Sequence, residues 1–309
     1  ETGELDLAVE SLQAAVEAEP TDVRYRLALV QLALRRGDLP LARSGIDTLL
    51  DAGADSPVLY ELGFHVFEQS GDLDRAAELA GRLIAAYPDE AVGHYLSGRL
   101  AHLDGDFDGA RAAYEKALAR ETDLPQALDG LVRVLLAADA PEAALARVEA
   151  ALSREPSRRD VALLRADVLH AAGRDAEAAH AWLALTERYP DWPAPWSKLA
   201  GHYREAGRAE AAEASLRAGL DATGWDPALG EQLAMTLLGA GRTEEAIGVF
   251  ESLHARHPDH DAVANNLAML LVTHRDDPED IARAGALVTP YADSRNPAYL
   301  DTVGWVRLR

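Results

Sequence analysis

The sequence lacks several residue types, and each absence removes a class of explanation. None of its 309 residues is cysteine, so the fold depends on no disulfide and on no thiolate-bound zinc. Glycine and proline occur singly rather than in tracts, which argues against a long linker. No apolar run reaches the roughly 18 residues that a membrane-spanning helix needs, so we expect no direct membrane insertion.

Lysine is nearly absent as well. The chain has two lysines, Lys116 and Lys198, among 30 basic residues, and its formal net charge is −22. Such an acidic surface repels nucleic acid and anionic lipid head groups, so neither is expected as the main partner. It favours cationic partners, or it simply keeps the molecule soluble. The preference for arginine over lysine, together with abundant alanine, is typical of a GC-rich genome and indicates a bacterial origin.

What the sequence does contain is a strict period of 34 residues. One turn residue recurs at this spacing, at Gly37, Gly71, Gly105, Asp139, Gly173, Gly207 and Gly241. Five residues later an alanine follows each time, at Ala42, Ala76, Ala110, Ala144, Ala178, Ala212 and Ala246. Nine residues later an apolar or aromatic residue follows, at Ile46, Ala80, Tyr114, Val148, Trp182, Leu216 and Phe250. Self-similarity of this length predicts a stack of supersecondary units.

This pattern resembles the tetratricopeptide repeat (TPR) family, whose unit is a pair of antiparallel helices. The resemblance covers essentially the whole chain and implies an all-α fold, a right-handed superhelical solenoid of antiparallel helix pairs with a 34-residue repeat. The repeats then begin at Val23, Pro57, Ala91, Pro125, Arg159, Pro193, Pro227 and Asp261. We call the two helices of a repeat helix A and helix B.

The physical chemistry of the pattern agrees with this interpretation. A glycine after helix A can take the left-handed conformation that ends a helix. The small alanine in helix B lets two helices approach closely, and the larger residue one turn later fills the space beside it. No unit buries its apolar face alone, so the stack forms one elongated core. Trp182 and Trp196 lie at packing positions, and we expect both in the core.

The period also predicts the boundaries within a single array of residues 1–309. Residues 1–22 are expected to form a helix B without its helix A. Residues 23–260 form seven full repeats, residues 261–296 an eighth repeat with a two-residue insertion, and residues 297–309 a helix A without its helix B. Neither end has a polar capping unit, which indicates a segment of a longer array. Val303, Trp305 and Val306 should then be partly exposed.

The insertion falls in the stretch "HRDDPED" of the eighth repeat. Arg275 takes the turn position, and the expected alanine, Ala282, follows seven residues later instead of five. Pro278 can occupy the first turn of the next helix, with Asp276 or Asp277 as its N-cap. A loop insertion without function is the simpler explanation, and a contact site for a partner is the alternative.

No catalytic constellation is recognisable, so we predict neither an enzyme nor a bound cofactor. No nucleophile lies in a characteristic turn, and no glycine-rich phosphate loop follows a strand. His254, His257 and His260 cluster near a helix end and could bind a transition metal. Histidines at helix C-termini are commonly surface residues that complement the helix dipole, so no metal site is predicted.

In the family, a concave groove is lined mainly by the second, fifth, ninth and twelfth residues of each unit. Carried over to this chain, the resemblance gives the candidate groove Glu61, His65, Glu68, Tyr95, Arg99, His102, Asp129, Arg133, Asp167, His170, Met235, Asn265 and Met269. The part toward the C-terminus is apolar, and it either binds a partner or packs against a continuation of the array. The carboxylates suggest a basic ligand, although Arg99 and Arg133 could pair with them.

Two specialisations of the family are not supported by the residues. Family members that bind acidic chaperone C-termini need cations at groove positions, and few are present here. Family members linked to glycosyltransferases carry an asparagine ladder at the sixth position, and only Asn266 fits.

The chain's ending, "NNLAMLL" followed by "NPAYLDTVGWVRLR", is similar to the closing units of long bacterial arrays linked to exopolysaccharide production or export. The resemblance implies a non-enzymatic scaffold in a bacterial envelope assembly. Its partner would be a protein or peptide, and a basic segment or a cationic polymer would suit the acidic charge. The alternatives are a cytoplasmic peptide-binding adaptor and the regulatory repeat region of a larger enzyme. The compartment is not fixed by the residues, and a periplasmic location is favoured.

Overall fold

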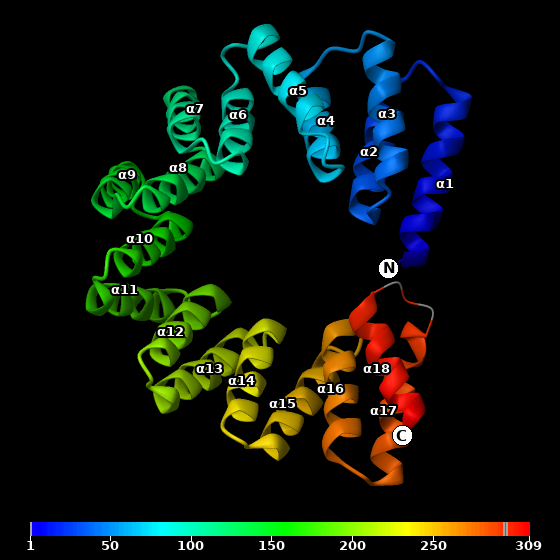
Figure 1. Ribbon diagram of the computed structural model, residues 1–309, viewed down its shortest axis with the longest axis vertical. Coiled ribbons are helices and arrows are strands. Elements are labelled where there is room, and N and C mark those ends of the chain that lie inside the picture. Colours follow the sequence, from blue (N-terminus) through cyan, green and yellow to red (C-terminus); the bar gives the residue numbers. More distant parts are fainter. Residues whose placement is uncertain (1, 293, 295) are drawn as a thin grey trace. The chain divides into compact units, whose positions relative to one another are not determined.

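Helices account for nearly all of the structure. The computed structural model describes residues 2–292, 294 and 296–309. Within these residues the chain forms eighteen α-helices, one 3-10 turn and no strand, and Figure 1 shows them following one another as antiparallel pairs. The fold is therefore an all-α repeat solenoid. None of the helices in the described residues combines the length and the apolar character needed to cross a membrane.

The helices have the following bounds. The first nine are α1 (Thr2–Ala18), α2 (Val23–Arg36), α3 (Leu39–Asp51), α4 (Pro57–Gln69), α5 (Leu73–Ala86), α6 (Ala91–Leu103), α7 (Phe107–Arg120), α8 (Pro125–Ala137) and α9 (Pro141–Arg154). They are followed by α10 (Arg159–Ala171), α11 (Asp175–Arg188), α12 (Pro193–Glu205), α13 (Ala209–Thr223), α14 (Pro227–Gly239), α15 (Thr243–Arg256), α16 (Asp261–His274), α17 (Pro278–Val288), the 3-10 turn η1 (Thr289–Tyr291) and α18 (Pro297–Leu308).

Local sequence signals set where the helices begin and end. Ser56 accepts a hydrogen bond from the backbone N–H of Leu59, and Pro57 occupies the first turn of α4, where no backbone donor is needed. After helix A the turn residue has a positive φ, for example 75° at Gly37. Asp139 takes the same position with a φ of 55°, although it carries a side chain. These turns reverse the chain within a few residues and make the two helices of a repeat antiparallel.

The repeated small and large residues form the seam of the stack. All seven alanines of the repeated column are 2% exposed or less. The residues one turn later are equally buried, and Trp182, Tyr114 and Phe250 are the largest of them. Trp196 is only partly buried and packs against the core that includes Leu216 and Leu220. The alanine column therefore sets a close helix–helix distance, and the larger residues fill the space beside it.

The chain divides into two compact units, residues 1–172 and 173–309. In the first unit each helix A contacts the helix A of the next repeat, from α2 to α4, α4 to α6, α6 to α8 and α8 to α10. One of its cores includes Phe64 and Phe67 of α4. In the second unit α12 contacts α14 and α16 contacts α18, around a core that includes Phe250.

The eighth repeat corrects one sequence-based expectation. Asp277 is the N-cap of α17, and its carboxylate accepts a hydrogen bond of 2.8 Å from the backbone N–H of Glu279. Pro278 occupies the first turn, as expected. The buried alanine, however, is Ala284 rather than Ala282, which is exposed. Ala284 lies four residues before the next buried residue, Val288, which is the spacing found in the other repeats. Packing against the core therefore sets the position of α17, and the preceding loop accommodates the extra residues.

Helix α18 corrects a second expectation. Val303 is only 5% exposed and belongs to the core of the second unit, whereas Val306 packs against that core and is partly exposed, as predicted. Trp305 is exposed, as predicted. The contacts of α18 with α16 and α17 explain the burial of Val303, because a helix A packs on the preceding repeat through one face even where its opposite face is open.

Candidate interaction groove

Six of the predicted groove residues lie around one hollow in the first unit. Helices α4, α6 and α8 are the A helices of three successive repeats, and side chains from their shared face surround a volume of about 500 Å³. We call this volume the groove hollow. Its lining residues are Glu68, Tyr95, Arg99, His102, Leu103, Tyr114, Gln126, Asp129, Gly130 and Arg133.

An ion pair joins α4 to α6 at one side of the groove hollow. Nη2 of Arg99 donates to both carboxylate oxygens of Glu68, at 2.6 and 2.7 Å. The guanidinium also lies 5.7 Å from the ring centre of Phe64 and 5.9 Å from that of Tyr95, within the range of cation–π attraction. Arg99 is therefore held from several sides, and its guanidinium has further N–H donors besides the group that binds Glu68.

A second ion pair lies on α8. Nε of Arg133 is 3.0 Å from Oδ2 of Asp129, one helical turn away. Both side chains are exposed, so this pair contributes little to stability and can open at small cost. Each carboxylate of the groove hollow thus has an arginine beside it. The positive charges of Arg99 and Arg133 therefore largely cancel the negative electrostatic potential expected from Glu68 and Asp129, although the chain as a whole is strongly acidic.

Tyr114 forms the floor of the groove hollow and enters it from a helix B. Its ring lies between α6 and α8, whose backbones come close because Gly98 and Gly130 face it. A Cβ at these two positions would lie 2.7 and 2.5 Å from atoms of the ring. Burial raises the pKa of Tyr114 to about 12, so the hydroxyl stays protonated at neutral pH. Within the described residues the hydroxyl makes no hydrogen bond, and it can donate one to a ligand.

The other predicted residues are placed elsewhere. On α4, Glu61 is half-buried outside the hollow, and Nδ1 of His65 lies 3.7 Å from Glu68. Asp167 and His170 are half-buried on α10. In the second unit, Met235 is 65% exposed and Met269 packs against the core. Asn265 is only 7% exposed, so it is a buried residue rather than an open groove residue.

Sequence reasoning missed four lining residues. Gln126 is the second residue of its repeat, so the family pattern already pointed to it. Tyr114 was assigned to the repeated apolar position of helix B that packs in the core. It is much larger than Ala80 and Val148 at the same position, and this size was the signal that its ring could extend between two A helices. Leu103 and Gly130 lie at no groove position of the repeat, and nothing in the sequence pattern distinguished them.

The histidine cluster has structural contacts of its own. Nε2 of His257 lies 2.9 Å from the carbonyl oxygen of Trp225, and Nδ1 of His260 accepts from the backbone N–H of Val263 at 3.3 Å. Nδ1 of His254 is buried and has no hydrogen-bond partner within the described residues. His260 is thus the N-cap of α16, and all three rings are half-buried, so the cluster differs from the exposed C-terminal histidines that the sequence suggested.

Comparisons with known proteins agree with the repeat architecture. The cellulose synthase operon protein C of Xanthomonas axonopodis is 32% identical over 198 residues, which is 59% of this chain. The chain spans only 12% of the length of that relative. A TPR repeat-containing protein of Pseudomonas aeruginosa is 36% identical over 76 residues, covering 24% of this chain and 71% of that protein.

A solved structure supports the fold. The crystal structure of a tetratricopeptide repeat protein from Parabacteroides merdae superposes with a TM-score of 0.58 at 18% identity, over 76% of this chain and 93% of that chain. Two family models, each described as the tetratricopeptide repeat, match this sequence. One covers residues 1–57, 63–125 and 232–294, and the other covers residues 101–166. These matches take in most of the helix pairs described above, and the chain belongs to the tetratricopeptide repeat family.

Proposed function

We propose that this chain is a non-enzymatic interaction scaffold of a bacterial envelope assembly that produces or exports a polysaccharide. The fold supports a protein-interaction role, because stacked helix pairs present an extended surface. The polysaccharide assignment rests on the similarity to the cellulose synthase operon protein C. The same similarity is the reason to favour the periplasm over the cytoplasm.

The observation that carries the proposal is the groove hollow. Its volume of about 500 Å³ lies within the range of about 300–1,000 Å³ that is usual for binding pockets. Its side chains come from three successive repeats, so an extended polypeptide lying across α4, α6 and α8 would contact all of them. Tyr95 offers aromatic surface, and Gln126 offers both a donor and an acceptor.

The paired charges narrow the class of ligand. Because Arg99 and Arg133 accompany Glu68 and Asp129, the groove hollow presents donors and acceptors side by side rather than a field of one sign. A peptide backbone, which carries one N–H and one C=O per residue, matches such a surface. A basic segment would have to displace the arginines from their carboxylates. We therefore infer that a polypeptide segment binds here, and that its affinity depends only weakly on salt.

The test is site-specific photo-crosslinking in the native host. A photoreactive phenylalanine at Gln126 should form adducts with proteins of the polysaccharide machinery in the envelope fraction, because Gln126 lines the groove hollow. Adding Arg99→Ala should reduce the adducts severalfold, since Arg99 is fixed at the same surface. The control carries the photoreactive residue at Ala112, which is exposed on α7 outside the hollow.

Two results would contradict the proposal. Adducts formed only with cytoplasmic proteins would favour an adaptor role. Equal adducts from the positions of Gln126 and Ala112 would show that the groove hollow is not the contact surface.

A further inference from the structure

Tyr114 carries a hydroxyl that the packing of the chain leaves without a partner. The side chain is only 2% exposed and lines the groove hollow, yet its hydroxyl makes no hydrogen bond to any residue that the structure describes. Other tyrosine hydroxyls in this chain differ. Tyr87 donates to Asp55 at 3.1 Å, and Tyr291 donates to Asp261 at 2.9 Å. Since buried polar groups are normally hydrogen-bonded, the Tyr114 hydroxyl needs an explanation of its own.

The ring of Tyr114 fits because two glycines make room for it, and the repeat requires neither of them. A Cβ at Gly98 of α6 would lie 2.7 Å from the ring, and one at Gly130 of α8 would lie 2.5 Å from it. Among the eight repeats that begin at residues 23 to 261, the position of Gly98 is otherwise valine, phenylalanine or alanine, and that of Gly130 is never glycine again. The tyrosine and its two glycines are therefore a combination local to the groove hollow.

Packing of the stack requires a large side chain at this position of helix B but not a hydroxyl. Phe250 occupies the same position in the seventh repeat and is also 2% exposed. A buried hydroxyl without a partner opposes folding, because its hydrogen bonds to water are lost and not replaced. The oxygen of Tyr114 therefore does nothing for the stack, whereas a ligand in the groove hollow would supply the missing partner.

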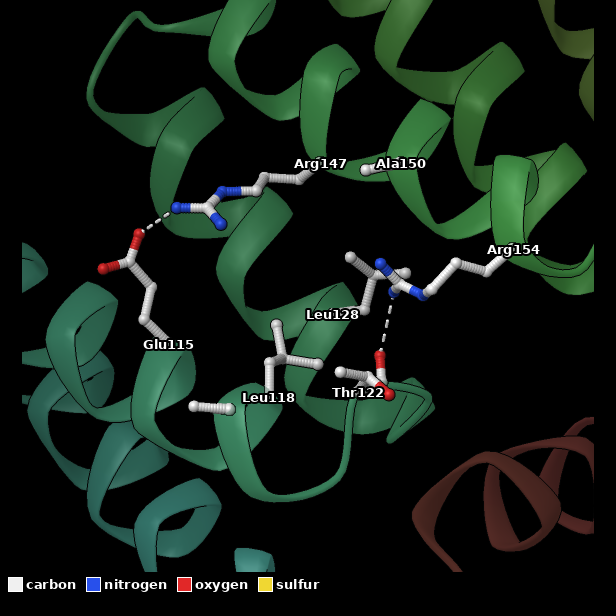
Figure 2. A pocket seen from close by; sticks show the side chains of 8 residues that line it. Glu115, Leu118, Thr122, Leu128, Arg147, Ala150 and Arg154 are labelled. Carbon is white, nitrogen blue, oxygen red and sulfur yellow. Dashed lines mark hydrogen bonds and ion pairs between the residues drawn. The ribbon is translucent and has the colours of Figure 1, made fainter.

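A second pocket of the first unit shows the opposite situation. It lies between α7 and α9 and has a volume of about 230 Å³. Figure 2 shows that its charged side chains bind within the chain, Arg147 to Glu115 and Arg154 to the carbonyl oxygen of Thr122 at 3.2 Å. Because these groups already have partners, they select no particular ligand. The groove hollow, in contrast, presents an unpartnered donor.

The surroundings of the Tyr114 hydroxyl select the kind of ligand atom. Burial raises its pKa to about 12, so at neutral pH the group is an uncharged O–H donor. The charged side chains that act on it are Arg99, Arg133 and Asp129. Asp129 already pairs with Arg133, as Glu68 does with Arg99. A ligand oxygen that accepts a hydrogen bond would complete the site, whereas an ammonium group would bring more donors beside two arginines.

We propose that the Tyr114 hydroxyl donates a hydrogen bond to a main-chain carbonyl oxygen of the bound polypeptide, and so fixes which peptide group lies over the floor of the groove hollow. The inference rests on the proposed function, since it takes the occupant to be a polypeptide. A neutral carbonyl matches this floor better than a carboxylate, because both arginines already have carboxylate partners that would repel a further anion. Tyr114 is thus a specificity-determining residue of the groove hollow.

The experiment is an NMR titration of the full chain with N-methylacetamide, a neutral mimic of one peptide group. The methyl groups of Leu103, which is 62% exposed and lines the groove hollow, report binding through saturable shifts. Tyr114→Phe should raise the dissociation constant about fivefold, because one hydrogen bond is lost. Methylammonium chloride, which offers donors only, should give no saturable shift. The matched control, Tyr203→Phe on α12 of the second unit, should leave N-methylacetamide binding unchanged.

Urea denaturation separates a ligand contact from a structural role. Tyr114→Phe keeps the ring and removes only the unpartnered oxygen, so the midpoint should equal that of the parent or exceed it. A lower midpoint would show that the hydroxyl has a partner in the folded chain, and the proposal would fail.

Three titration results would also overturn the proposal. They are the absence of saturable shifts at Leu103, an unchanged dissociation constant in Tyr114→Phe, and equal shifts with methylammonium. If crosslinked adducts from the position of Gln126 still form with envelope proteins, only the Tyr114 contact fails and the proposed function stands. Tyr114-dependent binding of N-methylacetamide without such adducts would support the contact and contradict the proposed function alone.

Discussion

At the scale of single residues, Asp139 departs most clearly from the repeat. It occupies the turn position that is glycine in the other six repeats, and it adopts the same left-handed backbone with a φ of 55°. A side chain in this conformation costs roughly 1–2 kcal/mol, somewhat less for aspartate, whereas glycine adopts it freely. The fourth repeated turn of the first unit therefore carries a strain that the glycine turns avoid.

Replacing this residue should stabilise the protein. We expect Asp139→Gly to raise the free energy of unfolding by about 0.5–1 kcal/mol, since the relief of strain exceeds the added flexibility of the unfolded chain. The midpoint of urea denaturation measures the effect. The reverse change, Gly105→Asp, should lower the midpoint, and a lower midpoint for Asp139→Gly would contradict the interpretation.

Residue identity alone predicted only part of the groove hollow. Arg99 and Glu68 could be placed there because their positions in the repeat fix the face of the helix on which they lie. Their pairing could be suspected but not established, since it depends on the rotamers of two long side chains from different repeats. The role of Tyr114 was hidden, because its access to the hollow depends on two glycines in neighbouring helices rather than on its own position.

At the scale of helices, arginines connect one repeat to the next. In the second unit Glu213 of α13 lies 2.6 Å from Arg242, which precedes α15, and 2.9 Å from Arg217. Arg242 also pairs with Glu245 of α15 at 2.6 Å. Burial pushes the pKa of Glu213 upward, but hydrogen bonds from Arg242 and Arg217 outweigh it and hold the pKa below its ordinary value.

This network should make stability depend on pH in the acid range. A carboxyl with a depressed pKa in the folded state stabilises the fold above its ordinary pKa of about 4.3, and this stabilisation is lost as the pH falls through the lower folded value. We expect Glu213→Gln to lose less stability than the parent between pH 6 and pH 3.5, measured by urea denaturation at both values. Glu187→Gln, an exposed change on α11, should behave like the parent. Identical pH dependence in all three proteins would show that Glu213 does not contribute to the pH dependence of stability.

The starts of the A helices were predictable from the sequence, because the 34-residue period fixes them. Helix α4 begins at Pro57 and α14 at Pro227, where the period places the start of a repeat. Which face of α17 packs against the core was not predictable from the spacing of the repeat. Ala282 is an alanine close to the position that the period predicts. Ala284 is nevertheless the alanine that contacts the core, because contacts with α16 determine the rotation of the helix about its axis.

At the scale of the whole molecule, the contacts are local in the sequence. Within each unit a helix meets its partner and the helices of the adjoining repeats. Stability in such a stack is approximately a sum of repeat and neighbour contributions, so different parts of the chain can open independently.

Hydrogen exchange can test this locality. Leu131→Ala in α8 removes a fully buried side chain and should cost about 2–5 kcal/mol locally. We expect faster amide exchange in α6 to α9 and unchanged exchange in α14 to α17, measured by mass spectrometry. Leu237→Ala in α14 should give the reverse pattern. Equal acceleration along the whole chain would show that both units open as one cooperative body.

The contacts from α2 to α4, α4 to α6 and α6 to α8 also bear on how the protein is made. A nascent chain leaves the ribosome in sequence order, and each helix of the first unit finds its neighbours among segments that emerged shortly before it. No helix there has to wait for a distant segment, so apolar faces such as that of α4 stay uncovered only for the time needed to synthesise about one further repeat. Assembly during translation, one helix pair at a time, is the folding route that this arrangement favours.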